Sequence, residues 1–597
     1  MNTKQLRLLF YDFEIFQYDW MVVIIDYSTR RKKVIINNRD ELIKFYELAK
    51  DNYIWIGYNS RNYDSVILKG IILGMNPKEL NDKLIIDGLK PFQISKEFNK
   101  IQLYSYDTMV NRGESLKQLE GMMGHMIKES DVDFNINRKL TKDEINETIY
   151  YCTHDVEETI EVFNRTKNDF DAHFALISEF KLPLKYFNKT KAQLSAMILG
   201  ANKLDDPVSE EMEYEFVDCL ELDKYKYVLN WFNENRFLTY VNEKGTTKKN
   251  QLKTTIAGVP TLFGWGGIHG CIDKYSTDNS DGSIIVHSDV NSMYPNIMVE
   301  HNLLSRAVSE PSKYKNILEK RLELKRQGKK KEQAPFKIIL NTCFGITIDK
   351  FNPMCDLKRG KEIPINGQLL LLDLIEHLEK EMGDKIFFIQ YNTDAVIAKI
   401  HSENDLPLYL RICEEWENRS RLKLAHDWIR TITQANVNNY VFEFTDGSLE
   451  CKGSFLQQNN DLKNDMPIIN DAIRDYLVNR IPVEDTINNC DELIKFQHIN
   501  KIGKTYSEVR WGDKKLKERV IRTFACTKDV PTLYKIKYVE KDGKVIESVQ
   551  RVADNSDNIF INNDNIVNEK CPDYLDKQWY IDLAIKRLKS FGINYGE

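Results

Sequence analysis

Two acidic residues stand at the ends of apolar segments that are typical of buried strands. Asp289 follows Ile284-Ile285-Val286 and opens the sequence Asp-Val-Asn-Ser-Met-Tyr-Pro, in which the proline enforces a turn. Asp394 lies further along the chain between the apolar runs 386–391 and 395–398, a pattern that predicts a β-hairpin with the acid at its tip. Two strand-end carboxylates brought together would form a site for two divalent metal ions, which is the arrangement used in phosphoryl transfer.

The segment between these acids, residues 337–345, has helical spacing. Lys337 and Asn341 lie one turn apart on one face, Phe344 continues this stripe, and Gly345 follows it. A lysine on such a face can contact the phosphates of an incoming nucleotide. The aromatic ring and the glycine would give a flat, close surface for a base pair.

In this order the three elements resemble motifs A, B and C of the B-family (polymerase-alpha-like) DNA polymerases, especially the compact bacteriophage-encoded ones. The usual forms are Asp-x-x-Ser-Leu-Tyr-Pro, Lys-x3-Asn-Ser-x-Tyr-Gly and Asp-Thr-Asp-Ser. The resemblance implies that Asp289 and Asp394 are catalytic metal ligands, joined by the backbone carbonyl of Val290. It also implies that Tyr294 packs beneath the nucleotide sugar, with Ser292 and Met293 beside the nucleotide.

Residues 313–337 are rich in lysine and arginine. We expect a helix that carries Arg321 and Lys325 one turn apart, a break over residues 327–331, and a second helix that starts near Pro335. This antiparallel helix pair resembles the fingers of the family, in which such side chains and that of Lys337 grip the triphosphate. A solvated basic helix is the alternative interpretation.

The N-terminal third contains a second set of acids. Residues 6–14 form an apolar strand pattern that ends in Asp12-x-Glu14, and a period of two places both carboxylates on one side of the strand. Asp64 closes the segment 59–64, which follows another apolar strand. Tyr151 and Asp155 lie one turn apart in a segment of helical period.

This ordered set resembles the three motifs of the 3′–5′ proofreading exonuclease of the same polymerases. The resemblance implies a two-metal site formed by the four carboxylates of Asp12, Glu14, Asp64 and Asp155. It assigns Tyr151 to orientation of the attacking water and Asn59 to contact with single-stranded DNA, although Asn59 lies one residue further from Asp64 than is usual. His154 is assigned no role.

The resemblance implies several further DNA contacts. The segment 264–270 is rich in glycine, which lets a backbone approach a ligand closely, although a plain glycine turn is an alternative interpretation. The family has a lysine at the position of Asn438, two residues before Tyr440, so the primer contact there departs from the pattern. The predicted DNA-binding residues are Asn59, Gly266, Gly267, Phe344, Gly345, Tyr440 and Lys452.

Motif C also departs from the family at two positions, because Asn392 replaces the first acid and Ala395 replaces the serine. The acid that ligates metal directly in the family is the second one, matched by Asp394. The main alternative is therefore a 3′–5′ exonuclease whose degenerate polymerase domain only binds DNA. A non-enzymatic DNA-binding scaffold is a third reading, against which the complete set of exonuclease acids argues.

The composition of the whole chain sets the context for these motifs. The chain has 597 residues, a formal charge of −6 and no apolar run of membrane-spanning length. Its ten cysteines are too far apart for a local zinc knuckle.

We expect a monomer with free thiols in a host bacterial cytoplasm. The expected ligands are primer–template DNA, dNTPs and two Mg²⁺ per active site, with Mn²⁺ as a substitute ion. A phage clamp, helicase and single-strand-binding protein are candidate partners. The short spacing between motifs leaves little room for protein priming.

The fold class that follows is multidomain α/β. It comprises an RNase H-like exonuclease domain and a right-hand polymerase, in which a palm with an antiparallel sheet is joined by helical-hairpin fingers and a thumb. The predicted boundaries are 1–165 for the exonuclease, 166–283 for a linking segment, 284–312 and 347–453 for the palm, 313–346 for the fingers and 454–597 for the thumb.

Overall fold

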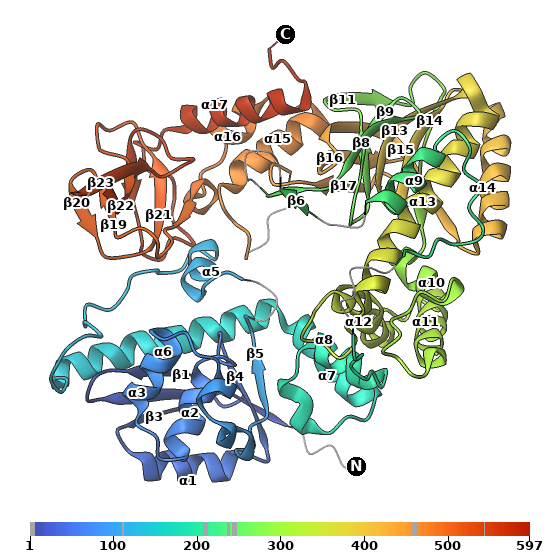
Figure 1. The fold of residues 1–597 in the computed structure, drawn as a ribbon. Helices are drawn as coiled ribbons and strands as arrows, with labels where there is room; N and C mark the ends of the chain where they lie inside the picture. The colour runs from blue at the N-terminus through green and yellow to red at the C-terminus, as the bar shows by residue number, and fades with distance from the viewer. Residues whose placement is uncertain are drawn as a thin grey trace. The chain divides into compact units, whose positions relative to one another are not determined.

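The computed structural model describes residues 6–109, 113–206, 213–235, 239–241, 247–456, 462–541 and 544–596. The chain divides into two compact units, and each contains both helices and sheets (Figure 1). The first unit comprises residues 1–190, 459–468 and 488–580, and the second comprises residues 191–458, 469–487 and 581–597. The structure is thus a mixed α/β fold with several sheets. The predicted domain boundaries stay predictions.

The N-terminal part of the first unit is built on a five-stranded mixed sheet in the order β3-β2-β1-β4-β5. Its strands are β1 (Arg7–Ile15), β2 (Trp20–Asp26), β3 (Lys32–Ile36), β4 (Tyr53–Gly57) and β5 (Ser105–Asp107). Its helices are α1 (Arg39–Ala49), α2 (Asp64–Ile72), α3 (Pro77–Ile85), α4 (Pro91–Ile94), α5 (Leu116–Met122), α6 (Lys142–Arg165) and α7 (Lys167–Glu179), with 3-10 turns η1 (Lys96–Lys100) and η2 (Leu184–Asn188). Helix α6 packs on β1 and β2, so the side chains at the end of β1 face it.

The C-terminal part of the first unit contains two small antiparallel sheets, β18-β21-β24 and β20-β19-β22-β23. Their strands are β18 (His498–Lys501), β19 (Glu508–Trp511), β20 (Lys514–Leu516), β21 (Val520–Ala525), β22 (Leu533–Lys541), β23 (Lys544–Arg551) and β24 (Ile559–Ile561), and the turn η5 (Leu493–Phe496) precedes them.

The buried guanidinium of Arg522 joins this part to the last turn of α5 and to the segment that follows it. It donates hydrogen bonds to the carbonyls of Gly121 (3.2 Å) and His125 (2.6 Å), and Arg522 is 0% exposed.

The second unit is built on a ten-stranded sheet in the order β17-β16-β15-β12-β14-β13-β10-β9-β8, with β11 paired to β15. Its strands are β8 (Leu252–Ile256), β9 (Val259–Phe263), β10 (Ile268–Cys271), β11 (Tyr275–Asp278), β12 (Ile284–Val290), β13 (Ile386–Thr393), β14 (Ala395–Ile400), β15 (Leu424–Asn436), β16 (Asn439–Phe444) and β17 (Leu449–Lys452). A separate two-stranded pair is formed by β6 (Thr239–Val241) and β7 (Thr247–Lys249).

The helices of the second unit include a pair joined by a short turn, α11 and α12, as the sequence predicts. The helices are α8 (Lys191–Ile198), α9 (Lys226–Glu234), α10 (Met293–Glu300), α11 (Pro311–Arg326), α12 (Lys330–Thr347), α13 (Leu357–Met382) and α14 (Leu406–Ser420), with turns η3 (Gly383–Lys385), η4 (Glu403–Asp405) and η6 (Lys589–Phe591). Residues of both units occur in α15 (Pro467–Asn479), α16 (Val483–Asn488) and α17 (Lys577–Leu588).

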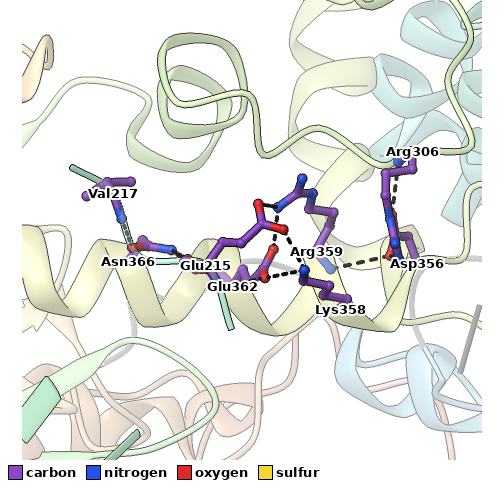
Figure 2. Close-up of polar contacts among 8 residues, drawn as sticks. All are labelled: Glu215, Val217, Arg306, Asp356, Lys358, Arg359, Glu362 and Asn366. Atoms are coloured by element: carbon purple, nitrogen blue, oxygen red, sulfur yellow. Dashed lines mark hydrogen bonds and ion pairs between the residues drawn. The ribbon is translucent and has the colours of Figure 1, made fainter. Parts of the chain in front are cut away.

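Helix α13 is almost completely buried, and several of its buried residues are polar. The reason is that segment 213–225 runs along it and has its main-chain groups satisfied by α13 side chains. Glu362 accepts from the backbone N–H of Glu215 (2.8 Å), and Asn366 accepts from that of Val217 (2.9 Å). Figure 2 shows this arrangement, in which the Glu215 side chain also contacts Arg359.

The ten cysteines are free thiols, of which six are buried and four are half-buried. Among the described residues, none of the helices combines the length and the apolar composition that a membrane span requires.

Candidate active sites

The first candidate site lies at the end of β12 in the second unit. Asp289 is the penultimate residue of this strand, and Asp394 occupies the tip of the β13–β14 hairpin, so both predicted elements are confirmed. Strands β12 and β14 are neighbours, with Asp289 opposite Ala395. The backbone N–H of Val290 donates to the carbonyl of Asp394 at 2.8 Å, which fixes the two acids side by side.

The electrostatics of this pair favour a bound cation. Burial raises the pKa of Asp289 to about 7, the charge of Asp394 adds to the rise, and Lys325 partly offsets it. Burial also raises the pKa of Asp394. Carboxylate oxygens are the ligands that Mg²⁺ and Mn²⁺ prefer, and two half-buried acids that repel one another gain most from a divalent ion, so the donor set fits such ions.

A cavity of about 430 Å³ opens beside the two acids. Every predicted nucleotide-binding residue except Lys337 lines it. The lining residues are Asp289, Asn291, Ser292, Met293, Tyr294, Pro295, Arg321, Lys325, Leu340, Asn341, Phe344, Thr393 and Asp394. Side chains from separate segments thus surround one space that has acids and cations in its wall.

The cations of this cavity come from α11. Arg321 donates to the hydroxyl of Ser292 at 2.7 Å, and Lys325 follows one turn later on the same face. The aromatic residues come from two other helices, because Tyr294 on α10 packs against Phe344 on α12 with ring centroids 4.6 Å apart.

One sequence expectation for α12 is wrong. The helix begins at Lys330 rather than near Pro335, and the proline lies inside it. The helical hydrogen bond from the N–H of Gln333 to the carbonyl of Lys329 (3.1 Å) forms before the proline is reached. Lys337 is exposed on this helix, one turn before Asn341, so its predicted phosphate contact stays a prediction.

The predicted primer contacts lie on the same sheet. Tyr440 and Lys452 are paired across β16 and β17, the Lys452 ammonium lies 5.7 Å from the Tyr440 ring, and the Tyr440 hydroxyl donates to Glu450 at 2.8 Å. Gly266 and Gly345 have open space where a side chain would project, whereas Gly267 lies against Thr393. Their predicted contacts with DNA stay predictions.

The second candidate site lies in the first unit, where β1 faces α6. Ligand atoms of Asp12, Glu14 and Cys152 lie within 4.8 Å of one another and could hold a metal ion. Asp64 is the first residue of α2 and accepts a hydrogen bond from the backbone N–H of Phe13 at 3.1 Å, which brings it to the same strand.

Asp155 and Tyr151 lie on α6, as predicted. Asp155 raises the pKa of both Asp12 and Glu14, so it belongs to the same constellation. Tyr151 is half-buried, and burial together with Glu147 raises its pKa, which keeps the phenol protonated. Asn59 is exposed in the loop before α2 and has a left-handed backbone with φ of 56°.

Burial is the main cause of a raised pKa for all four acids of this site. Repulsion from the other site acids adds to the rise for Asp12 and Glu14, whereas Asp107 adds to it for Asp64 and Glu120 adds to it for Asp155. The pKa of Glu14 rises to about 8 and that of Asp64 to about 7, while those of Asp12 and Asp155 are also raised. Such a group of oxygen donors fits divalent metal ions for the same reason as the first site.

Sequence reasoning missed two residues of this site. Lys117 on α5 forms ion pairs of 2.9 Å with Asp155 and with Glu120, and the Glu120 side chain is completely buried. Ligand atoms of Glu120, His154 and Asp155 also lie within 4.8 Å of one another, so His154 is closer to the site than expected. A lysine and a glutamate three residues apart on a short helix resemble any surface pair, so no local signal marks them.

A third group, Asp218, Cys219 and His301, has ligand atoms within 4.8 Å of one another outside both sites. The guanidinium of Arg421 lies 3.2 Å from His301 and 3.5 Å from Asp218, so a positive charge already faces this group.

Comparison with known proteins gives limited information. No protein-family model matches the chain, and no curated protein matches it. Among solved structures, the family B DNA polymerase from the hyperthermophilic archaeon Pyrobaculum calidifontis is similar over 99% of this chain and 78% of that chain. The TM-score is 0.43 and the identity is 14%.

Proposed function

We propose that the chain is a DNA polymerase that extends a primer 3′-hydroxyl with dNTPs under the direction of a template, and that a separate site removes nucleotides from the 3′ end as a proofreading exonuclease. One observation carries this proposal. Each compact unit contains its own group of at least partly buried acids with raised pKa values, and these are the acids that the motif resemblance singles out in the sequence.

At the first site the chain's own residues would bind and orient the nucleotide. Arg321 and Lys325 lie on the cavity wall beside the two acids, where they would contact phosphate oxygens. The packed rings of Tyr294 and Phe344 would support the sugar and the base. Divalent ions held by Asp289 and Asp394 would supply the positive charge that offsets charge developing on the transferred phosphoryl group.

At the second site Asp12, Glu14, Asp64 and Asp155 would hold divalent ions of the same kind. Tyr151, protonated at neutral pH, would donate a hydrogen bond at the mouth of the site and orient the attacking water. Lys117 would hold the Asp155 carboxylate in place by the 2.9 Å ion pair. We further propose a monomeric, phage-encoded replicative enzyme with primer–template DNA as its substrate.

The first test is incubation of the protein with a labelled recessed primer–template and Mg²⁺, with and without dNTPs. We expect extension when dNTPs are present and 3′ shortening when they are absent. Asp289→Asn should abolish extension and leave shortening intact, and Asp12→Ala should do the reverse. Loss of both activities in either variant, with the thermal unfolding profile unchanged, would contradict the two-site proposal.

The same assay separates the alternative function. A 3′–5′ exonuclease whose second unit only binds DNA is suggested by Asn392 and Ala395, which replace family residues beside Asp394. That protein would shorten the primer under both conditions and would still bind dNTP in a metal-dependent way.

A further inference from the structure

The acid at the hairpin tip follows a strained residue. Thr393 has a backbone φ of 61°, and the N–H of Asp394 donates to the carbonyl of Asn392 at 2.7 Å, which closes a three-residue turn centred on Thr393. A β-branched residue in the left-handed region is costly and persists only where its surroundings hold it. The direction of the Asp394 side chain therefore depends on the residues that pack against Thr393.

The neighbour that holds Thr393 is Gly267, the residue before β10. Strand β10 pairs with β13, and Ile268 lies opposite Thr393. A Cβ atom on Gly267 would lie 2.5 Å from the Thr393 hydroxyl and 2.8 Å from both its Cα and its Cβ. Because one of these atoms belongs to the backbone, a side-chain rotation cannot relieve the overlap.

The glycine segment is also held on its other side, at Gly264. Gln368 on α13 is buried, accepts from the N–H of Gly264 at 3.1 Å and donates to the Gly264 carbonyl at 2.9 Å. We therefore expect a side chain at Gly267 to displace Thr393, and with it Asp394. Gly264 itself has room, since its Cβ would meet Gln251 Cγ at 3.4 Å, Gln251 Nε2 at 3.6 Å and the Asn250 carbonyl at 4.0 Å, which are ordinary van der Waals contacts.

We propose that Gly267 is a positioning residue for polymerisation: its missing side chain lets β10 hold the strained turn at Thr393 and so aims Asp394 at Asp289. This inference rests on the proposed polymerase activity of the second unit. It assigns Gly267 a role inside the protein, separate from the contact with DNA that its glycine-rich segment suggests.

The test compares Gly267→Ala with Gly264→Ala. For Gly267→Ala we expect kcat for extension to fall by about 10- to 100-fold, because displacement of a reacting group by about 1 Å costs rate on this scale. The Mg²⁺ concentration for half-maximal rate should rise, while the Kd for primer–template changes less than about twofold and 3′ shortening is unchanged. Gly264→Ala should match the parent protein.

Rescue makes the test specific. In Gly267→Ala/Thr393→Gly, two of the three close contacts disappear and the turn residue tolerates a positive φ, so kcat should recover by about 10-fold relative to Gly267→Ala. Loss of primer–template affinity in Gly267→Ala with kcat retained would overturn the inference in favour of DNA contact. An equal loss in Gly264→Ala, or no rescue by Thr393→Gly, would also overturn it.

A separate readout distinguishes this inference from the proposed function. Mg²⁺ should raise the melting temperature of the second unit, and Gly267→Ala should reduce that rise while Gly264→Ala does not. Should the parent protein fail to extend a primer, the proposed function is wrong. The positioning role would then stand or fall on the melting shift alone.

Discussion

Replacement of Asp289 by asparagine should stabilise the metal-free protein. The folded state raises the pKa of this carboxyl from 3.8 to about 7 through burial and the charge of Asp394. A rise in pKa of this size corresponds to at most about 4 kcal/mol of unfavourable free energy when the Asp289 carboxyl is ionised. Because this carboxyl is only partly buried, we discount this to about 1–2 kcal/mol.

The sign of the pH dependence follows from the direction of the shift. Between pH 4 and pH 7 the unfolded chain releases this proton while the folded chain keeps it, so stability falls as pH rises through the folded pKa. The advantage of Asp289→Asn over the parent should therefore be small near pH 4.5, grow through pH 7 and become constant above it.

Scanning calorimetry in EDTA at pH 5 and pH 8 measures this difference. Asp384→Asn is the matched control, because Asp384 is an exposed acid elsewhere in the second unit. We expect Asp289→Asn to be more stable than Asp384→Asn by a small amount at pH 5 and by a larger amount at pH 8. If Asp289→Asn were no more stable than Asp384→Asn at pH 8, the ionised Asp289 carboxyl would not be destabilised by burial and by Asp394 as the structure indicates.

Three other substitutions test the surroundings of the sites. Lys117→Ala should reduce 3′ shortening by at least about 10-fold and leave extension unchanged, since Asp155 loses its ion pair; equal rates in a gel assay would contradict this role. Tyr294→Ala should raise ribonucleotide incorporation relative to dNTP, and unchanged sugar selectivity in competition assays would remove Tyr294 from that role. Arg522→Met should lower the free energy of unfolding of the first unit by roughly 3 kcal/mol, because buried carbonyls lose their donor. In the same denaturant titrations, the exposed control Arg551→Met should change the free energy of unfolding by less than about 0.5 kcal/mol.

Local patterns in the sequence predicted the elements that bear the acids. Strand β12, the β13–β14 hairpin and the helical character of α12 follow from apolar periodicity that tertiary packing reinforces. The start of α12 was not predictable in this way, because a proline marks a first turn only when no earlier residue can form a helical hydrogen bond. Lys329 and Gln333 form such a bond.

The residues that hold neighbouring segments in place were harder to predict, since their hydrogen bonds and ion pairs join partners that are distant in the sequence. Glu362, Asn366 and Glu376 would be assigned to the solvent face of α13 by their polarity. They are buried because they accept hydrogen bonds from the main chain of segment 213–225, and Glu376 alone accepts from three N–H groups. Lys117 is similar, because its importance arises only from the approach of α5 to α6.

The departures at Asn392 and Ala395 have explanations in packing. The Asn392 amide donates to the carbonyl of Val437 at 3.2 Å, and an ionised aspartate in its place would have no donor for that oxygen. Ala395 is buried and lies opposite both Asp289 and Asn392 in the sheet, where a methyl group needs no hydrogen-bond partner. The Asn392 hydrogen bond therefore stabilises the turn that carries Asp394, and Ala395 packs beside it without an unpaired polar atom. Their difference from the family pattern is consequently not, on its own, a reason to expect a second unit without catalysis.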